Sequence, residues 1–187
     1  MLRLKSSTVG FKEWSLVCDA LGGGAQSLIL RKGGIAEGKG GFQWQCSEFL
    51  LFPTHFHEQA ARVHWQPTPE VVAAMATPEV IEIRHAARLE WHQNITDWDV
   101  AARLAPFHVW NEEVIRERFG YGDVTGLSIA FCRIYQLPEP WRLEQRPAFG
   151  GCRSWLDLPE RETGDLTPVL SDDEHAARDA ALRALIE

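Results

Sequence analysis

The pattern of apolar and polar positions divides the first third of the chain into short elements. Apolar residues recur at helical spacing between residues 11 and 21, and the glycines at 22–24 end this predicted helix. A strand is expected over 27–31, because an apolar run there stops abruptly at cations. The glycine-rich residues 33–41 then predict a loop, and residues 42–53 predict a second strand region.

The middle of the chain contains two long predicted strands separated by helices. The stronger strand covers residues 127–137, which are rich in β-branched and aromatic side chains, and Pro138 and Pro140 are expected to end it. The other strand, over residues 80–91, is expected to be long or bent. The remaining predicted elements are a turn or short helix over 55–62, helices over 70–76, 97–104 and 112–119, and an edge strand over 154–158.

The end of the chain predicts an alanine-rich helix. Ser171 and Glu174 have the spacing of a capping box at its start. We therefore expect a single domain over residues 1–158, followed by an acidic linker and C-terminal helix over 159–187 that docks on the body or projects from it. Helices and strands do not alternate regularly, which predicts an α+β fold with a mixed or barrel-like sheet flanked by helices.

Composition narrows the class of protein. An apolar content of 45% in 187 residues supports one sizeable core, to which eight Trp and nine Phe would contribute. If some of these rings are exposed, they would offer stacking surfaces for bases. The formal net charge of −7 argues against a domain that grips duplex DNA along its whole surface, and it leaves room for a local basic pocket.

Cysteine usage indicates a reducing compartment. Cys18, Cys46, Cys132 and Cys152 are far apart in the sequence and lack zinc-ribbon spacing. We therefore expect reduced thiols in a cytoplasmic protein without a signal peptide. No apolar run approaches the roughly 20 residues of a membrane helix, and no cofactor is expected. The oligomeric state is left open.

The first predicted strand ends in groups that suit an anion. Arg31 and Lys32 close the strand, and Gly33 and Gly34 follow with approachable backbone amides. A guanidinium together with free amides is suited to binding phosphate oxygens. The alternative is a solvated strand end before a flexible hairpin, with Arg31 paired to an acid such as Glu37.

The second predicted strand region is followed by two histidines. If His55 and His57 lie on a strand, their imidazoles face the same side and, with Glu58 adjacent, could share a zinc or manganese ion. If Pro53 starts a turn, the two rings diverge. No spacing marks a further ligand, so no metal is assigned to this pair.

Three other residues carry open alternatives. Arg133 lies within an apolar strand, where a buried guanidinium requires either an ion pair or a polar cavity. Glu13 is expected on the surface of the first helix, or else paired with Arg31. Cys152 could be a catalytic cysteine, since its neighbour Arg153 would favour the thiolate, but the absence of a histidine beside it argues against this role.

A nuclease pattern is also present in part. Glu37 and Lys39 have the spacing of the Glu-x-Lys half of a restriction-type site, and Asp19 stands eighteen residues before Glu37. Such sites use the acids to hold Mg²⁺ and the lysine to assist the attacking water. Here the pair lies among glycines instead of on a strand, which favours a polar flexible loop.

Motifs spread over the chain as far as residue 158 resemble one bacterial family. They are Lys12-Glu13-Trp14, Leu30-Arg31-Lys32-Gly33-Gly34-Ile35 with Glu37, Phe49-Leu50-Leu51-Phe52-Pro53-Thr54 with Phe56-His57, Arg133-Ile134-Tyr135-Gln136-Leu137 with Pro140, and Gly151-Cys152-Arg153-Ser154-Trp155. They are similar to an uncharacterised family, domain of unknown function 1802. The resemblance implies no activity, and it favours nucleic acid as the expected ligand.

Residues 24–31 are similar to a second family, the ASCH domains, which are relatives of the PUA barrels that handle RNA. That family has the pattern Gly-x-Lys-x-x-Glu-x-Arg, and Gly24 and Arg31 keep its first and last positions. Gln26 and Ile29 stand where the Lys and Glu would be. The resemblance therefore implies a PUA-like barrel that binds a ligand through Arg31 and lacks the acid–base pair for hydrolysis.

These features together predict a protein that binds a phosphate-bearing ligand or nucleic acid through its basic, glycine-rich loop. The expected ligand-binding residues are Arg31, Lys32, Gly33, Gly34, His55, His57 and Arg133. One alternative is a metal-dependent nuclease associated with restriction-type systems. Another is a non-catalytic interaction subunit whose acidic C-terminal helix docks a partner. The sequence leaves open whether the protein is an enzyme.

Overall fold

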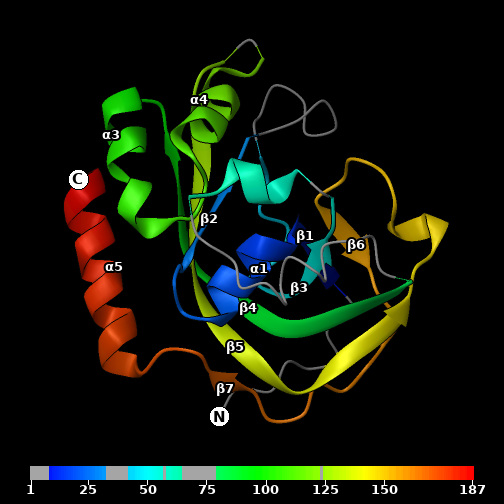
Figure 1. Cartoon of the computed structure of the whole chain (residues 1–187). Helices are drawn as coiled ribbons and strands as arrows, with labels where there is room; N and C mark the ends of the chain where they lie inside the picture. The colour runs from blue at the N-terminus through cyan, green and yellow to red at the C-terminus, as the bar shows by residue number, and fades with distance from the viewer. Residues whose placement is uncertain (1–8, 33–41, 57, 65–78, 123) are drawn as a thin grey trace.

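The computed structural model describes residues 9–32, 42–56, 58–64, 79–122 and 124–187 (Figure 1). Helices and strands alternate irregularly along these residues. In chain order the elements are β1 (Val9–Trp14), α1 (Ser15–Gly22), β2 (Leu28–Arg31), β3 (Glu48–Thr54), the 3₁₀ turn η2 (Gln59–Arg62), β4 (Val80–Ile95), α3 (Trp98–Arg103), the 3₁₀ turn η3 (Ala105–Phe107), α4 (Glu112–Gly120), β5 (Leu127–Glu144), the 3₁₀ turn η4 (Pro147–Phe149), β6 (Trp155–Asp157), β7 (Thr167–Pro168) and α5 (Asp172–Ile186).

The strands form one mixed sheet that curls into a half-barrel. Its order is β2-β5-β4-β3-β1-β6, with β7 paired to β5 off this path. The pair β1 and β3 is parallel, and the other ladders are antiparallel. The long strands β4 and β5 curve around α1, which contacts β3, β4 and β5 (Figure 1). The predicted α+β fold with a barrel-like sheet is therefore confirmed.

Bulges in the long ladder account for this curvature. The register between β4 and β5 shifts between Ile83 and His85 and again between Leu89 and Trp91. At the first shift, consecutive pairs are Ile83 with Trp141 and His85 with Gln136. Extra unpaired residues bend a strand and increase its twist. The sheet can therefore wrap around α1.

The prediction that Pro138 and Pro140 end β5 is wrong. The strand continues through both prolines to Glu144. Both prolines fall in the bulge opposite Arg84, between the paired residues Gln136 and Trp141. A bulge needs no ladder hydrogen bond from them, so the missing proline N–H groups do not interrupt the sheet.

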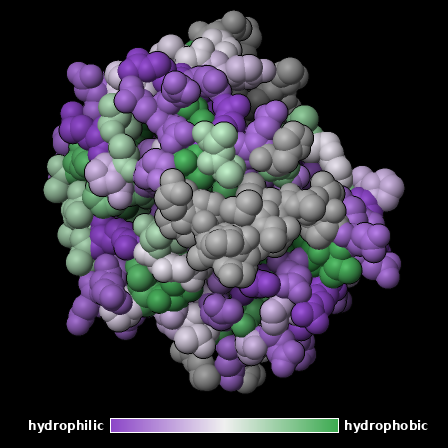
Figure 2. Space-filling model, viewed as in Figure 1, coloured by the Kyte–Doolittle hydropathy of each residue, from purple (hydrophilic) through white to green (hydrophobic). Residues whose placement is uncertain are grey.

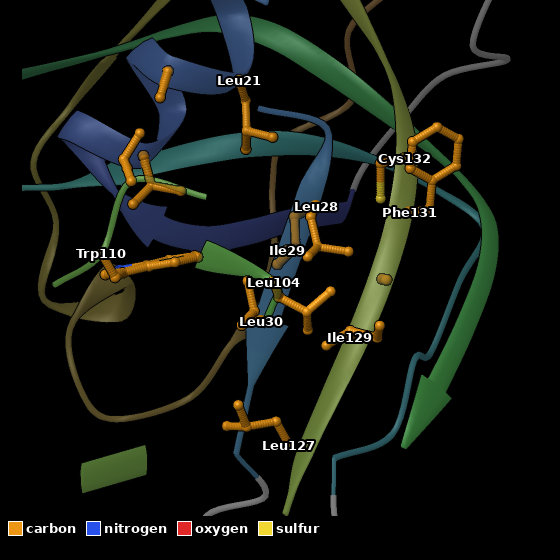
Figure 3. Packing of buried hydrophobic residues seen from close by; sticks show 14 of the residues in the cluster. Leu21, Leu28, Ile29, Leu30, Leu104, Trp110, Leu127, Ile129, Phe131 and Cys132 are labelled. Atoms are coloured by element: carbon orange, nitrogen blue, oxygen red, sulfur yellow. The ribbon is translucent and has the colours of Figure 1, made fainter. Parts of the chain in front are cut away.

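The curled sheet buries apolar side chains on both faces. On β3, Phe49 and Leu51 belong to the larger cluster, whereas Leu50 and Phe52 belong to a second cluster on the other face. Both faces of this strand are covered, which explains its continuous apolar run. In the larger cluster, Leu28, Ile129 and Leu104 are among the side chains that pack together inside the barrel (Figure 3).

The first element differs from its prediction. A helix was expected from residue 11, but residues Val9–Trp14 form β1 and the helix begins at Ser15. Burial alternates along the strand, with Phe11 and Glu13 buried and Lys12 and Trp14 half-buried. Phe11 and Trp14 are three residues apart, which is a helical spacing, whereas the strand buries Phe11 and Glu13, which are two residues apart.

The predicted helices at 97–104 and 112–119 correspond to α3 and α4. The expected helix over 70–76 lies outside the described residues. The capping box at Ser171 and Glu174 is present at the start of α5. That helix docks on the body: the ring of His175 stacks on Phe131 at 4.6 Å between centroids, and Arg178 Nη1 donates to the Gly24 carbonyl at 2.8 Å.

Polar and apolar side chains are interspersed on the face shown in Figure 2, where apolar groups gather in small patches. The large apolar residues with the greatest exposure among the described residues are Val80, Tyr121 and Val124. Within the part of the chain that the structure describes, no helix is long and apolar enough to cross a membrane.

Candidate anion-binding pocket

Arg31 links two strands of the half-barrel that share no ladder. Strand β2 begins the sheet order and β1 lies near its other end. From the end of β2, Arg31 Nη1 donates to Glu13 Oε2 on β1 at 2.7 Å, and Nη2 donates to the Lys12 carbonyl. The guanidinium also stands over the Phe11 ring, 4.4 Å from its centroid. One side chain therefore bridges the open side of the sheet.

Glu13 is the buried anchor of this bridge. Its side chain has no exposed surface, and its Oε1 accepts a hydrogen bond from the Trp14 backbone N–H at 2.8 Å. A buried carboxylate is tolerated when a cation and backbone donors satisfy it. The predicted alternative in which Glu13 pairs with Arg31 is therefore confirmed, and the proposed pairing of Arg31 with Glu37 involves a residue outside the described ranges.

A pocket of about 280 Å³ opens beside this bridge. It lies where β1, the end of β2, the Arg118 side chain of α4 and the segment before β6 meet. Its described lining comprises Lys12, Glu13, Trp14, Leu30, Arg31, Lys32, Thr54, Arg118, Gly151, Cys152, Arg153 and Ser154. Five of these side chains are cations and one is an acid, which is already paired with Arg31.

The cations in this pocket are crowded. Burial lowers the pKa of Lys12, and the charge of Arg153 lowers it further. Burial also lowers the pKa of Arg118 to about 10, and the charges of Arg31 and Arg62 add to this effect while Glu13 opposes it. When like charges disfavour the charged form of a group, a nearby anion stabilises that charged form. The pocket is therefore electrostatically suited to a negatively charged group.

Arg118 has donor capacity that its surroundings leave unused. Its guanidinium lies 5.0 Å from the centroid of the Trp14 ring and 4.8 Å from that of Trp110. Its Nη1 is buried and has no hydrogen-bond partner among the described residues. Cation–π contacts hold a guanidinium in place without consuming its N–H groups. Arg118 thus lines the pocket with a guanidinium whose donors are not all used.

Lys32 has a different environment. Its Nζ donates to the carbonyls of Phe119 at 3.1 Å and Gly126 at 3.0 Å, and also to that of Val124. These acceptors use as many donors as an ammonium group has. Lys32 therefore organises the segment between α4 and β5, and it contributes charge to the pocket it lines.

The structure brings only some of the predicted site residues together. Arg31 and Lys32 line the pocket, whereas Gly33, Gly34 and His57 lie outside the described residues. His55 is half-buried at the end of β3, where burial lowers its pKa, and it does not line this pocket.

Arg133 lies in a different environment from Arg31. It belongs to β5, five residues beyond Ser128, which pairs with Arg31 in the ladder. That separation corresponds to roughly 17 Å along a strand. Its Nη2 donates to Asp172 Oδ1 at 2.6 Å and to the Leu170 carbonyl at 3.1 Å. Of the two predicted alternatives, the structure shows the ion pair, which ties the start of α5 to the sheet.

Sequence reasoning did not identify Lys12 and Arg118 as site residues. Lys12 lies between buried neighbours on a strand that was expected to be helical, and Arg118 lies on α4, far away in sequence. Arg153 was noticed only as a neighbour of Cys152. The repeated pattern of cations beside aromatic residues was a usable signal, but only the curled sheet places these cations in one pocket.

The residues of the nuclease hypothesis are mostly outside this site. Asp19 lies on α1, where burial raises its pKa, and Glu37 and Lys39 lie outside the described ranges. Among the residues that the structure describes, no cluster of His, Cys, Asp and Glu could hold a metal ion.

Comparison with known proteins identifies the family and the fold. A model described as domain of unknown function (DUF1802) matches residues 10–181. Among solved structures, a mutant form of the ASCH protein from Zymomonas mobilis aligns with a TM-score of 0.51 and 11% identity, over 93% of this chain and 94% of that one. A second mutant form aligns with a TM-score of 0.50 and 13% identity, over 93% and 96%. The fold is therefore ASCH-like. No curated protein matches the sequence.

Proposed function

The chain belongs to the DUF1802 family, whose function is unknown, and we propose that its basic pocket binds a phosphate-bearing ligand, specifically a nucleic acid. The observation that carries this proposal is the convergence of Lys12, Arg31, Lys32, Arg118 and Arg153 on one pocket. The chain as a whole carries a formal charge of −7, so this concentration of positive charge is local. A local cationic pocket on an acidic protein selects an anion.

The geometry of the donors favours phosphate over a single carboxylate. Guanidinium groups from different directions and the Lys12 ammonium face the same volume, which suits a group with several acceptor oxygens. Lys12 Nζ donates to the carbonyls of Gly150 and Gly151 at 3.0 and 2.9 Å, so it is fixed on the pocket wall. Trp14 adds an aromatic surface at the edge of the same pocket.

Nucleic acid is the phosphate carrier that agrees with the rest of the molecule. The chain shares its fold with an ASCH protein, and its sequence resemblance to the ASCH domains implies a relation to the PUA barrels that handle RNA. Phosphate contacts provide affinity, and aromatic rings stack on bases without strict sequence preference. The expected mode of binding is therefore a single strand whose phosphate enters the basic pocket.

The test is a salt titration of binding to labelled single-stranded RNA and DNA of roughly 10 nucleotides, followed by fluorescence anisotropy. Arg153 is exposed and lines the pocket, so Arg153→Gln should weaken binding and reduce the slope of log K against log salt by about 1. Arg118→Gln should weaken it further, because it removes the unused donor.

Arg142→Gln is the matched control. Arg142 is an exposed arginine on β5 that pairs with Glu82 and does not line the pocket, so its removal should leave the salt slope unchanged. Arg31 and Lys32 are poorer test positions because both hold the fold together. The proposal fails if neither RNA nor DNA binds at low salt, or if Arg153→Gln and Arg118→Gln both bind as Arg142→Gln and the wild type do.

A further inference from the structure

Unpaired polar atoms gather beside the basic pocket. Among the described residues, the buried side-chain nitrogen and oxygen atoms without a hydrogen-bond partner are Arg62 Nε, His108 Nδ1, Trp110 Nε1 and Arg118 Nη1. They come from η2 and, some fifty residues later, from α4 and the segment that directly precedes it. Buried polar groups are normally paired, and a cluster of unpaired ones requires an explanation.

These atoms belong to one contiguous group of rings and guanidinium groups. The His108 and Trp110 ring centroids are 5.7 Å apart, and the Arg118 guanidinium lies 4.8 Å from the Trp110 ring. Arg62 and Arg118 stand 6.0 and 5.0 Å from the Trp14 ring centroid. We call this group, made of Trp14, Arg62, His108, Trp110 and Arg118, the donor cluster.

The donor cluster adjoins the basic pocket. Trp14 and Arg118 belong to the cluster and also line the pocket, so a ligand that fills the pocket contacts two members of the cluster. The Arg118 guanidinium, held against the Trp14 and Trp110 rings, stands between the two. A group bound at the cluster is therefore next to a group bound in the pocket.

The chemistry of the cluster selects a second acceptor group with negative charge. The free atoms on Arg62, Trp110 and Arg118 are N–H donors that cannot accept a hydrogen bond. Two of them belong to guanidinium cations, and the nearby acid Glu117 is exposed and already paired with Arg62. A phosphate oxygen meets these requirements.

We infer that the donor cluster binds a second phosphate of the same strand that places its first phosphate in the basic pocket. The preferred ligand is therefore an oligonucleotide with at least two phosphates, and not a mononucleotide. This inference rests on the proposed function and extends it, because it states how the strand continues beyond the pocket and which side chains follow it.

The experiment compares uridine 5′-monophosphate with the dinucleotide pUpU by isothermal titration calorimetry on the wild-type chain. The dinucleotide should bind at least about tenfold more tightly, since a charge-assisted hydrogen bond contributes roughly that factor. Arg62→Gln should remove most of this advantage and leave monophosphate binding unchanged. The DNA dinucleotide pTpT, measured in the same way, shows whether the preferred strand is RNA or DNA. Tighter binding of either dinucleotide than of the monophosphate supports the inference.

Glu117→Gln is the matched control for Arg62→Gln. It breaks the same Arg62–Glu117 ion pair but leaves the Arg62 donors in place, and Glu117 is 65% exposed in its side chain. This variant should keep the dinucleotide advantage. Circular dichroism and urea unfolding of both variants separate lost binding from lost folding.

The outcomes distinguish this inference from the proposed function. If the monophosphate binds and the dinucleotide is no tighter, or if Arg62→Gln and Glu117→Gln behave alike, the donor cluster serves the protein itself and the inference is overturned. If neither nucleotide binds, the proposed function fails and the inference fails with it.

Discussion

Glu13 and Arg31 are joined by a 2.7 Å ion pair across the open side of the half-barrel, between strands that have no backbone ladder in common. The Glu13 side chain has no exposed surface and that of Arg31 is 12% exposed. This pair therefore fixes the wall of the basic pocket and also closes the sheet. Stability and binding are linked at this point of the structure.

Removing one member of this pair should destabilise the protein strongly, because it leaves the other charge buried and unpaired. We expect Glu13→Gln to lower the free energy of unfolding by about 3 kcal/mol, and Arg31→Met by a similar amount. The double variant should lose about 2 kcal/mol less than the sum of the two, since it buries no isolated charge.

Urea denaturation of the wild type, both single variants and the double variant measures this coupling. Glu112→Ala provides the control, because its pair with Arg116 is exposed on α4 and should contribute less than about 1 kcal/mol. Strictly additive losses in the cycle would show that the ion pair does not join β1 to β2 energetically.

The sequence was a good guide to elements with long or strongly marked patterns. The strand beginning at Leu127, the helix beginning at Glu112 and the capping box at Ser171 are where they were expected. Each of these depends on local chemistry. The first strand was misassigned because the apolar residues Phe11 and Trp14 have a helical spacing, and β5 continues through its prolines because a bulge accommodates them.

The candidate site was predictable only in part, for a topological reason. Arg31 was recognisable as a cation at the end of an apolar strand. Lys12, Arg118 and Arg153 reach the same pocket because the sheet curls, and nothing in their spacing encodes that contact. Conversely, Arg133 had the same local appearance as Arg31, yet it lies further along β5 and pairs with Asp172.

Lys32 should stabilise the segment between α4 and β5. Its Nζ donates to the carbonyls of Phe119, Val124 and Gly126, and Lys32→Met removes all of these bonds. We expect a loss of about 1–3 kcal/mol, concentrated in this segment. Hydrogen exchange should become faster for the Gly126 amide, which bonds to the Phe119 carbonyl, and stay unchanged in α5. Uniformly faster exchange would contradict a local role.

Two helix-ending glycines should respond differently to alanine. A Cβ at Gly22 would lie 2.1 Å from Cε1 of His85, which is buried against α1, whereas a Cβ at Gly120 meets nothing within 4 Å among the described residues. Overpacking of this kind costs about 1–3 kcal/mol. Gly22→Ala should therefore lower the free energy of unfolding by about 2 kcal/mol, and Gly120→Ala should leave it unchanged or raise it by less than about 1 kcal/mol.

Urea midpoints of the two alanine variants measure this difference. His85→Ala in the Gly22→Ala background provides the physical check, since it removes the ring that the new methyl group meets. His85→Ala should lower the free energy of unfolding less in the Gly22→Ala background than in the wild type. Equal midpoints for Gly22→Ala and Gly120→Ala would mean that His85 moves aside without loss.

Acid should destabilise the fold through His108. Burial, with the positive charges of His64 and Arg118, lowers the pKa of His108 from 6.5 to about 4. Between these values the unfolded chain binds a proton that the folded chain does not, so this contribution to stability is complete above pH 6.5 and declines as the pH falls towards 4. At pH 5 the loss relative to pH 7 is about 2 kcal/mol.

His108→Gln removes this titration. The free energy of unfolding of the variant should therefore fall by about 2 kcal/mol less than that of the wild type between pH 7 and pH 5. Other acid-sensitive groups, such as His55 and His85, titrate equally in both proteins and cancel in the comparison. Urea denaturation at the two pH values supplies all of the required quantities. Parallel decreases in the two proteins would show that His108 does not remain neutral in the folded state.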